Sequence, residues 1–381
     1  MNSTLTQERI IALRKKRSAQ DLRFKYYGFI AMCLALAVLV FLLYSIFSRG
    51  FTAFQKTTIL LEINYDQEVL KLTPDSTEQE IEKGKFFKVK KNALNNVFEN
   101  LSKSDAKLIK KLFSTNIDKE IKNYYIDNPS VLNTTQKLWV TAHSNVDQML
   151  KGNSRRDVPE DRRKLNDIQL SFIDQLVEED RIQKEFNNFF FTRADSRHPE
   201  IAGIAGSFMG SLLTLFVVFI LSFPIAIGAS VYLEEFAPKN KLTELIEVNI
   251  SNLAAVPSIV FGLLGLGVLL NVFGFPRSTP LVGGTVLALM TLPTIIIACR
   301  ASLKAVPPSI KEGALAIGAT KSQAVFHHVV PLALPGTLTG TIIGLAQALG
   351  ETAPLIMIGM VAFIPNIPTG ITEPSASLPV Q

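Results

Sequence analysis

Five long runs of this chain contain no Asp, Glu, Lys or Arg, and they limit its possible folds more than any other feature. The runs cover residues 26–48, 201–233, 248–276, 278–299 and 322–350. Each is longer than the roughly 18–20 residues that a helix needs to cross the hydrocarbon core of a bilayer. Helices in soluble proteins average only about 10–14 residues. The runs therefore exclude a soluble globule and predict an all-α polytopic membrane protein.

The charged residues are concentrated between these runs. Residues 50–200 contain 24 acidic and 24 basic side chains, whereas residues 201–381 contain only 7 of each. The net charge of +6 therefore comes from residues 1–25 and from Arg49. A nucleic-acid interface requires Lys and Arg spread over one folded face. This distribution predicts contact with membrane lipid and no nucleic-acid partner.

Lys and Arg near the ends of membrane spans mark the cytoplasmic side. The motif Arg14-Lys15-Lys16-Arg17 therefore assigns residues 1–25 to a basic cytoplasmic tail. Counting spans from that end, residues 50–200 lie outside, in the periplasm, and the loop of residues 300–323 lies inside. The odd number of spans leaves residues 352–381 outside. We expect either that this tail folds back or that the chain stops before a final helix.

Residues 26–48 are interpreted as a retained transmembrane anchor. A signal peptide is the alternative interpretation. The apolar part of a signal peptide is shorter than this run, and no small-residue cleavage site precedes Arg49-Gly50-Phe51. The anchor is therefore preferred.

Residues 50–200 are expected to form a small extracytoplasmic α+β domain inserted after the anchor. Alternation of apolar and polar residues predicts a strand with one buried face, at Ile59, Leu61, Ile63 and Tyr65. Helical spacing is found in two sets, Leu108, Leu112 and Ile117, and Ile168, Phe172, Leu176 and Ile182. A charged linker is the alternative, but the many aromatic residues argue against it. The segment has no cysteine and no catalytic or metal-binding constellation, so its role is not predicted.

The inner loop after the fourth apolar run has the signals of a short helix–turn–helix. Ser309 and Glu312 have the spacing of a capping box, which predicts a helix that opens after two prolines. Gly318 is suited to end that helix, and Thr320 with Gln323 repeats the capping pattern for a second helix. Small residues in this loop would let another protein approach its backbone. The alternative is a compact re-entry loop in which Glu312 is only a cap.

Two further patterns in this region do not predict a ligand site. Gly313 and Gly318 are spaced as in a phosphate-binding loop, but Lys321 comes three residues after the second glycine instead of one. The adjacent His327 and His328 point to different faces of a helix, which argues against a metal site. No metal site is therefore predicted.

Three glycines repeat every four residues in the last apolar run. Gly336, Gly340 and Gly344 share one helix face, and close helix packing is the favoured interpretation. The same stripe could instead border a permeation path.

The motifs of the C-terminal half resemble those of ABC-transporter permeases. Glu312-Gly313-Ala314, followed by Gly318 and Pro331, is similar to the EAA loop of these proteins. Further strings resemble the PstA family of phosphate-transporter permeases; these are Leu233-Glu234-Glu235-Phe236-Ala237-Pro238, Leu253-Ala254-Ala255-Val256-Pro257-Ser258-Ile259-Val260 and Ala348-Leu349-Gly350-Glu351-Thr352-Ala353-Pro354-Leu355. The resemblance covers residues 195–381. The insertion at residues 50–200 is similar to the extra N-terminal domain of a subset of this family.

The resemblance implies a type I ABC-importer permease fold for residues 201–381, in the bacterial inner membrane. It implies a phosphate importer with a PstC-like sister permease, a dimer of PstB-like ATPase subunits and a periplasmic PstS-like phosphate-binding protein. ATP and Mg would bind to the ATPase, so no cofactor and no catalytic residue is expected in this chain. Glu312, Gly313, Ala314 and Gly318 would couple the permease to the ATPase.

The candidates for the translocation path are Arg300, Gln347, Glu351 and Thr352. Charged residues at membrane depth are candidates for functional residues, because they are costly to place there. Arg300 either marks the interface or offers phosphate a charged fork. Glu351 would repel phosphate, so we expect it to act in gating or in anchoring a helix.

The sequence departs from the family pattern at several positions. Gly313 replaces the first Ala of the EAA motif, which costs about 1 kcal/mol of helix propensity. Gln347 stands where many members have Arg, so a direct arginine contact to phosphate is not expected there. Members also have one more helix after residues 377–381, so the chain is expected to be truncated.

Phosphate import is the predicted function, and two alternatives remain open. One is a permease for another oxyanion such as sulfate or molybdate. The other is a membrane-tethered sensor whose outer domain binds a ligand. A sensor would need an inner signalling domain, and no inner segment is long enough to form one.

Overall fold

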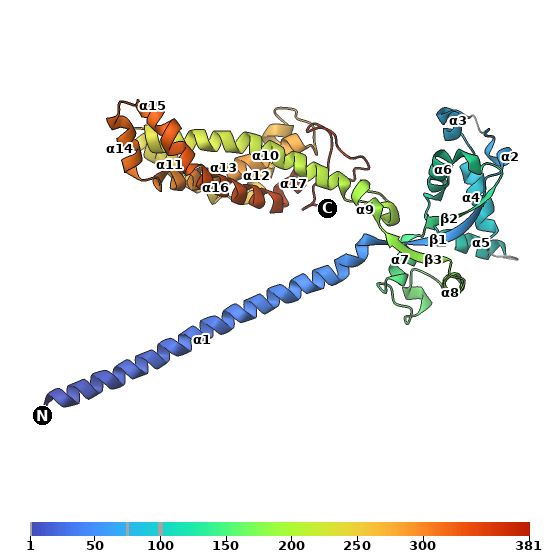
Figure 1. Ribbon diagram of the computed structural model, residues 1–381, viewed down its shortest axis with the longest axis horizontal. Coiled ribbons are helices and arrows are strands. Elements are labelled where there is room, and N and C mark those ends of the chain that lie inside the picture. Colours follow the sequence, from blue (N-terminus) through green and yellow to red (C-terminus); the bar gives the residue numbers. More distant parts are fainter. Residues whose placement is uncertain (1, 74–75, 98–101) are drawn as a thin grey trace. The chain divides into compact units, whose positions relative to one another are not determined.

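The computed structural model describes residues 2–73, 76–97 and 102–381 (Figure 1). The chain divides into two compact units. The first comprises Met1–Phe113 and Ile117–Asn187, and the second comprises Ser114–Asn116 and Asn188–Gln381. We call the part of the first unit after residue 50 the sheet domain, and the second unit the helical unit.

The first unit begins with one long helix, α1 (Asn2–Gly50). Its segment from Leu22 onward is long and apolar enough to cross a membrane, and none of its most apolar window is buried within the chain. The span predicted at residues 26–48 is therefore confirmed as an apolar helix. The side chains of the basic motif at residues 14–17 lie outside the described residues.

The sheet domain is built on three antiparallel strands in the order β2-β1-β3. They are β1 (Gln55–Asn64), β2 (Thr135–Thr141) and β3 (Ile182–Phe186). Ile59, Leu61 and Ile63 on β1 are fully buried, as their alternation predicted. Strand side chains point to opposite faces in turn, so these three enter one core. Helices pack over this core, and the predicted α+β character is confirmed.

The helices of the sheet domain are short. They are α2 (Gln67–Leu70), α3 (Glu78–Glu82), α4 (Phe86–Asn95), α5 (Lys103–Ile109), α6 (Ile117–Asp127), α7 (Ser144–Leu150) and α8 (Asp167–Glu178). Four 3₁₀ turns accompany them, η1 (Phe51–Phe54), η2 (Lys110–Leu112), η3 (Pro129–Val131) and η4 (Glu160–Arg162).

Two helical patterns predicted in this domain are wrong at their ends. The pattern through residues 108–117 is split, because Phe113 is extended and forms a bridge with Ala142. Ile182 begins β3 and does not continue α8. Asp180 has φ +53°, and Arg181 N–H donates to the Leu176 carbonyl at 2.9 Å, which ends the helix in a left-handed turn.

An ion pair at the end of α7, between Asp147 and Lys151, is hydrogen-bonded to β1. The Asp147 carboxylate accepts hydrogen bonds from the Thr57 N–H at 3.0 Å and from the Thr57 hydroxyl at 2.8 Å. Its other oxygen lies 2.6 Å from Lys151 Nζ, and the two charged side chains are only 15% and 5% exposed. The Lys151 ammonium therefore depends on this carboxylate for its charge partner.

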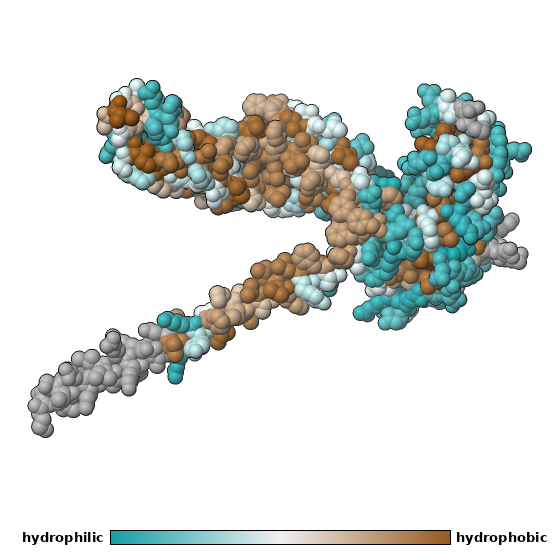
Figure 2. Space-filling model, viewed as in Figure 1, coloured by the Kyte–Doolittle hydropathy of each residue, from teal (hydrophilic) through white to brown (hydrophobic). Residues whose placement is uncertain are grey.

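The helical unit consists of long and short helices. They are α9 (Asn188–Thr192), α10 (Ala205–Val231), α11 (Lys241–Ala254), α12 (Ser258–Leu264), α13 (Pro280–Lys304), α14 (Pro308–Ala316), α15 (Lys321–Ala324), α16 (Val330–Gly350) and α17 (Ala353–Met357). A 3₁₀ turn, η5 (Pro199–Ile201), and three π-helical turns, η6 (Tyr232–Phe236), η7 (Gly265–Leu270) and η8 (Val325–Val329), complete it. Figure 2 shows the apolar colour that spreads over this unit, in contrast to the hydrophilic sheet domain.

Four helical segments of the described chain are long and apolar enough to cross a membrane. They confirm the predicted runs at 26–48, 201–233, 278–299 and 322–350. The run at 248–276 is not one straight helix, because α11 and the segment Ser258–Leu270 meet at an angle of 102°. Pro257 lies at this break, where it has no N–H to donate and disfavours helical backbone in the residue before it.

The described residues after α17 pack against the helical unit as an irregular segment with several turns. Ser375 N–H donates to the Ser278 carbonyl at 2.7 Å, and Leu378 N–H donates to the Ser211 hydroxyl at 2.8 Å. Gly210 on α10 permits this approach, because a Cβ there would lie 2.1 Å from the Ala376 carbonyl oxygen. These contacts hold the described C-terminal residues against α10 and the turn before α13.

We predict that Asp147→Ala destabilises the sheet domain by about 3–5 kcal/mol, because it leaves the Lys151 ammonium buried without its partner. Trp139, the single tryptophan of the chain, lies on β2, so its fluorescence during urea unfolding of the full chain reports on this domain.

Lys137→Ala is the matched control. It breaks the Lys137–Glu62 pair, whose side chains are 69% and 61% exposed, and we expect a cost below about 1 kcal/mol. Equal shifts of the urea midpoint for the two variants would contradict the prediction.

Candidate functional site

The predicted helix–turn–helix is present as α14 and α15. The helix α14 begins at Pro308 with Pro307 as its N-cap residue, so the capping box predicted for Ser309 and Glu312 is wrong. Proline suits the first helical position, because its φ is already helical and an N–H there would have no helical partner. The second capping box is confirmed, with Thr320 N–H donating to Gln323 Oε1 at 2.9 Å and Gln323 N–H donating to the Thr320 hydroxyl at 3.3 Å.

Gly318 ends α14 in the predicted way. Its φ is +93°, in the left-handed region that glycine adopts without a steric cost. Ala319 N–H donates to the Ala314 carbonyl at 3.1 Å, and Gly318 N–H donates to the Leu315 carbonyl at 3.0 Å. These two bonds are those of a Schellman motif, which satisfies the last carbonyls of a helix.

The helix α14 turns one side toward the unit and leaves the other open. Ala314 is buried, whereas Glu312, Gly313 and Gly318 are exposed. A Cβ placed on Gly313 would have no atom within 4 Å. Ile317, at the end of the helix, is 86% exposed. The loop therefore presents an open backbone next to an unburied isoleucine.

Arg300, near the end of α13, holds two glutamates. Its Nε lies 3.4 Å from Glu234 and its Nη2 lies 2.8 Å from Glu247, while its side chain is only 16% exposed. Lys304 Nζ is 3.6 Å from the same Glu234 oxygen. Arg300 thus links η6 to α11, and its guanidinium already has two carboxylate partners.

A further ion pair ties α14 to the same region. Lys311 on α14 pairs with Glu235 on η6, where the Glu235 side chain is only 10% exposed. The next residue, Phe236, stacks with Phe326 on η8 at 6.4 Å between ring centroids, and Lys321 Nζ lies 5.2 Å from its ring. We call this region, shown around α11, α14 and α15 in Figure 1, the charged end.

Two π-helical turns lie at the charged end. The first, η6, follows the C-terminal end of α10, and the second, η8, directly precedes α16. Short π-helical segments occur often at functional sites, because the extra residue re-aims the side chains that follow. Here they carry Glu234, Glu235 and Phe236 on one side and Phe326 on the other.

The glycine stripe of α16 faces α13. A Cβ on Gly336 would lie 2.4 Å from Ser302 Oγ, and one on Gly340 would lie 2.3 Å from the Ala298 Cβ. A Cβ on Gly344 would lie 2.9 Å from Ile295. The two helices therefore approach more closely than any larger residue at these positions would allow.

Arg300 is separated from the other three candidates for the translocation path. Arg300 lies at the charged end, two residues before Ser302 on α13, and Ser302 packs against Gly336 of α16. Gln347 is eleven residues further along α16, which at 1.5 Å per residue is about 16 Å away. Glu351 follows the helix as its C-cap residue, and Thr352 is the N-cap residue of α17, its carbonyl accepting the Ile356 N–H.

The ion-pair partners at the charged end were missed by reasoning from the sequence. The family string that contains Glu234 and Glu235 predicts no partner for either carboxylate. The available signal was that two acids directly follow an apolar run on the side predicted to carry Arg300. No cluster of three or more His, Cys, Asp or Glu suited to a metal occurs among the described residues.

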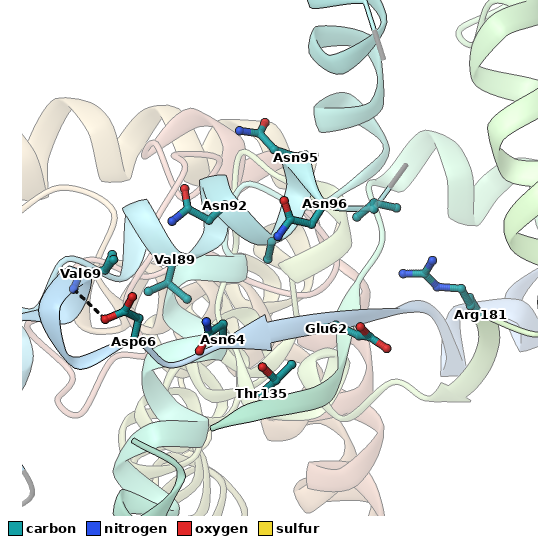
Figure 3. Close-up of a pocket in the computed structure, with 12 residues that line it drawn as sticks. Glu62, Asn64, Asp66, Val69, Val89, Asn92, Asn95, Asn96, Thr135 and Arg181 are labelled. Atoms are coloured by element: carbon teal, nitrogen blue, oxygen red, sulfur yellow. Dashed lines mark hydrogen bonds between the residues drawn. The ribbon is translucent and has the colours of Figure 1, made fainter. Parts of the chain in front are cut away.

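The sheet domain contains a polar cleft of about 540 Å³. Figure 3 shows Asn92, Asn95 and Asn96 from α4 and the turn after it, with Glu62 and Asn64 from β1. Its charged groups are used within the domain. Glu62 pairs with Lys137 at 3.6 Å, Asp66 Oδ1 caps α2, and Arg181 pairs with Glu179 and donates to the Leu60 carbonyl.

Comparison with known families finds two separate matches, one in each half of the chain. Residues 222–377 match the family described as "Binding-protein-dependent transport system inner membrane component". Residues 12–160 match a domain of unknown function (DUF3333). The C-terminal part of the chain is therefore similar to the membrane components of transport systems, and the N-terminal part matches a separate family.

Curated relatives match the chain at about 30% identity. The "Probable ABC transporter permease protein YqgI" of Bacillus subtilis is 31% identical over 168 residues, 44% of this chain and 56% of that protein. The "Phosphate transport system permease protein PstC" of Haemophilus influenzae is 32% identical, covering 45% and 61%. The "Probable phosphate transport system permease protein PstA" of Methanocaldococcus jannaschii is 30% identical, covering 47% and 62%.

These relatives confirm the resemblance to phosphate-transport permeases, and they include both PstA and PstC proteins. The chain spans between 56% and 62% of the length of these relatives.

We predict that Gly340→Ala destabilises the helical unit by about 1–3 kcal/mol, because the new methyl group overlaps Ala298. Adding Ala298→Gly to this variant removes the overlap and should restore most of the loss. The measurement is the temperature at which the buried Cys299 thiol becomes reactive toward a thiol-specific dye. A Cys33→Ser background leaves Cys299 as the single thiol.

Gly228→Ala on α10 is the control, since a Cβ there has no atom within 4 Å. Failure of the double variant to recover would show that the clash is not with Ala298.

Proposed function

We propose that this chain is the permease subunit of an ATP-driven importer of inorganic phosphate in the bacterial inner membrane. In this proposal it forms the translocation path with a PstC-like sister permease. A dimer of PstB-like ATPase subunits binds at the charged end, and a PstS-like periplasmic protein delivers phosphate. The N-terminus lies in the cytoplasm, and residues 50–200 lie in the periplasm. ATP hydrolysis belongs to the ATPase, and this chain is not an enzyme.

The observation that carries this proposal is the exposed surface of α14. Ala314 buries one side of the helix, and a Schellman turn at Gly318 ends it. Glu312, Gly313 and Ile317 are exposed on the other side. A partner that displaces α14 acts on Lys311 and therefore on Glu235 at the end of α10. Coupling between two sites needs such a link between the binding surface and an element that moves.

The contacts at the charged end support a proposed role for one of the path candidates. Arg300 has two carboxylate partners, so we assign it to holding η6 and α11 at the charged end. Gln347, Glu351 and Thr352 lie together around the junction of α16 and α17 and remain the candidates for the path. Glu351 is assigned to gating or anchoring, because a carboxylate repels phosphate.

We predict that Gly313→Trp abolishes coupling while Gly313→Ala preserves it. The tryptophan fills open space, so the chain stays folded, but it blocks close approach of the ATPase. A tenfold loss of ATP-dependent phosphate uptake in proteoliposomes corresponds to about 1.4 kcal/mol of lost interaction. We expect at least this loss for tryptophan, and a gain of about 0.5–1 kcal/mol in helix stability for alanine.

Retention of the ATPase during purification shows whether Gly313→Trp affects docking or only the later movement. Uptake at the unmodified rate, in a variant whose Cys299 exposure temperature is unchanged, would rule out α14 as the coupling element.

Substrate identity is tested by counterflow in the reconstituted complex. Vesicles loaded with unlabelled phosphate should accumulate radiolabelled phosphate from outside, whereas vesicles loaded with sulfate or molybdate should not. Preferential exchange driven by sulfate or molybdate would keep the permease assignment and replace its substrate.

A further inference from the structure

A second cleft in the sheet domain has basic walls. It measures about 360 Å³ and lies between α7 and the segment that leads to α8. Arg155, Arg162, Arg163 and Lys164 line it, together with the amides of Asn145 and Gln148. Asp157, Glu160 and Asp161 are close in sequence but are not among its lining residues. The cleft is therefore lined by basic side chains, although the domain as a whole contains equal numbers of acidic and basic residues.

The basic residues of this segment fall into two groups. Arg156 Nη2 pairs with Asp174 at 2.8 Å and its Nε donates to Met149 Sδ, which fixes that side chain to the domain. Arg155, Arg162 and Lys164 form no ion pair within the part of the chain that the structure describes. Three cations thus share one cleft without a carboxylate to neutralise them.

Arg163 supplies an independent observation. Its side chain is only 10% exposed, and one end of its guanidinium pairs with Asp167. Its Nε is buried and has no hydrogen-bond partner. A buried donor without an acceptor costs about 1–3 kcal/mol, and more when the group is charged. A guanidinium in this position points to an acceptor that the chain itself does not provide.

The chemistry of that acceptor follows from the donors. Arginine side chains present N–H groups in a planar fork that matches the oxygens of phosphate or carboxylate. The amide side chain of Gln148 adds a further donor, since its oxygen already accepts from Asn153 at 2.9 Å. The larger cleft of Figure 3 differs, because its charges are neutralised within the domain.

We propose that this basic cleft binds a phosphate group. The shared chemistry is a tetrahedral oxyanion held by Arg155, Arg162 and Arg163, with Lys164 as a further positive charge. The phosphate is either free inorganic phosphate or the headgroup of an anionic phospholipid. The inference is independent of transport by the helical unit, and its test measures binding only.

The test compares two double variants of the full chain in neutral-lipid nanodiscs. Arg155→Gln with Arg162→Gln removes two charges from the cleft. Lys88→Gln with Lys91→Gln removes two exposed charges from α4, outside it. Calorimetric titration uses inorganic phosphate in one arm and a soluble short-chain phosphatidylglycerol in the other. The Trp139 unfolding transition verifies that each variant is folded.

We expect the cleft variant to bind at least one of the two probes about tenfold more weakly, with less than about a twofold change in the α4 variant. Loss confined to inorganic phosphate identifies the free anion, and loss confined to phosphatidylglycerol identifies the lipid. Equal weakening by both variants, or no weakening by either, overturns the proposal.

A second measurement needs no substitution. Phenylglyoxal modifies accessible arginines, and peptide mass spectrometry measures the rate at each site. The probe that binds should slow modification of Arg155 and Arg162 in the unmodified chain and leave Arg197, outside the cleft, unchanged. Protection of none of these sites, or of all of them equally, overturns the proposal even if the cleft variant does not fold.

Discussion

The need to satisfy backbone hydrogen bonds without water governs the helical unit. In a bilayer, N–H and C=O groups must pair within the chain, so helices are the available structure. Apolar helices gain no hydrophobic energy against one another there, and close approach at small residues replaces it. The chain provides this approach on both sides of α13, through Gly340 of α16 against Ala298 and through Gly284 of α13 against Val217 of α10. The remaining contacts of the unit depend on this packing.

Because the apolar helices exclude charge, the ionic groups of the unit gather where the helices end. Glu234 and Glu235 are bound there by cations from two different helices, α13 and α14. Removing one partner from a poorly solvated pair is costly, since the other charge is left without compensation. The charged end therefore resists separation of α14 from the π-helical end of α10. In the coupling proposed above, this pair would link a movement of α14 to η6.

The sequence predicts those features that depend on local periodicity and length. Uncharged runs identified four apolar helices, alternation identified β1, and Gly318 with Thr320 identified the turn between α14 and α15. The prediction from the sequence is wrong where a single residue changes the direction of the backbone. Pro257 bends the run at 248–276 through 102°, and Asp180 ends α8 before Ile182. It also missed Glu247 beside Arg300, because that pairing depends on how α11 lies against α13 and not on the spacing of residues.

The distribution of charge acts at three scales in this protein. Over the whole chain, the excess of +6 lies in the N-terminal tail and Arg49, and the orientation proposed for the chain rests on it. Within the helical unit, equal numbers of acids and bases pair at the charged end. Within the sheet domain the totals are also equal, yet the acids of residues 157–161 are absent from the walls of the basic cleft. At physiological salt, charges interact over only about 8 Å. An anion at the cleft therefore senses its nearest guanidinium groups, and a domain with no net charge can still select a phosphate group.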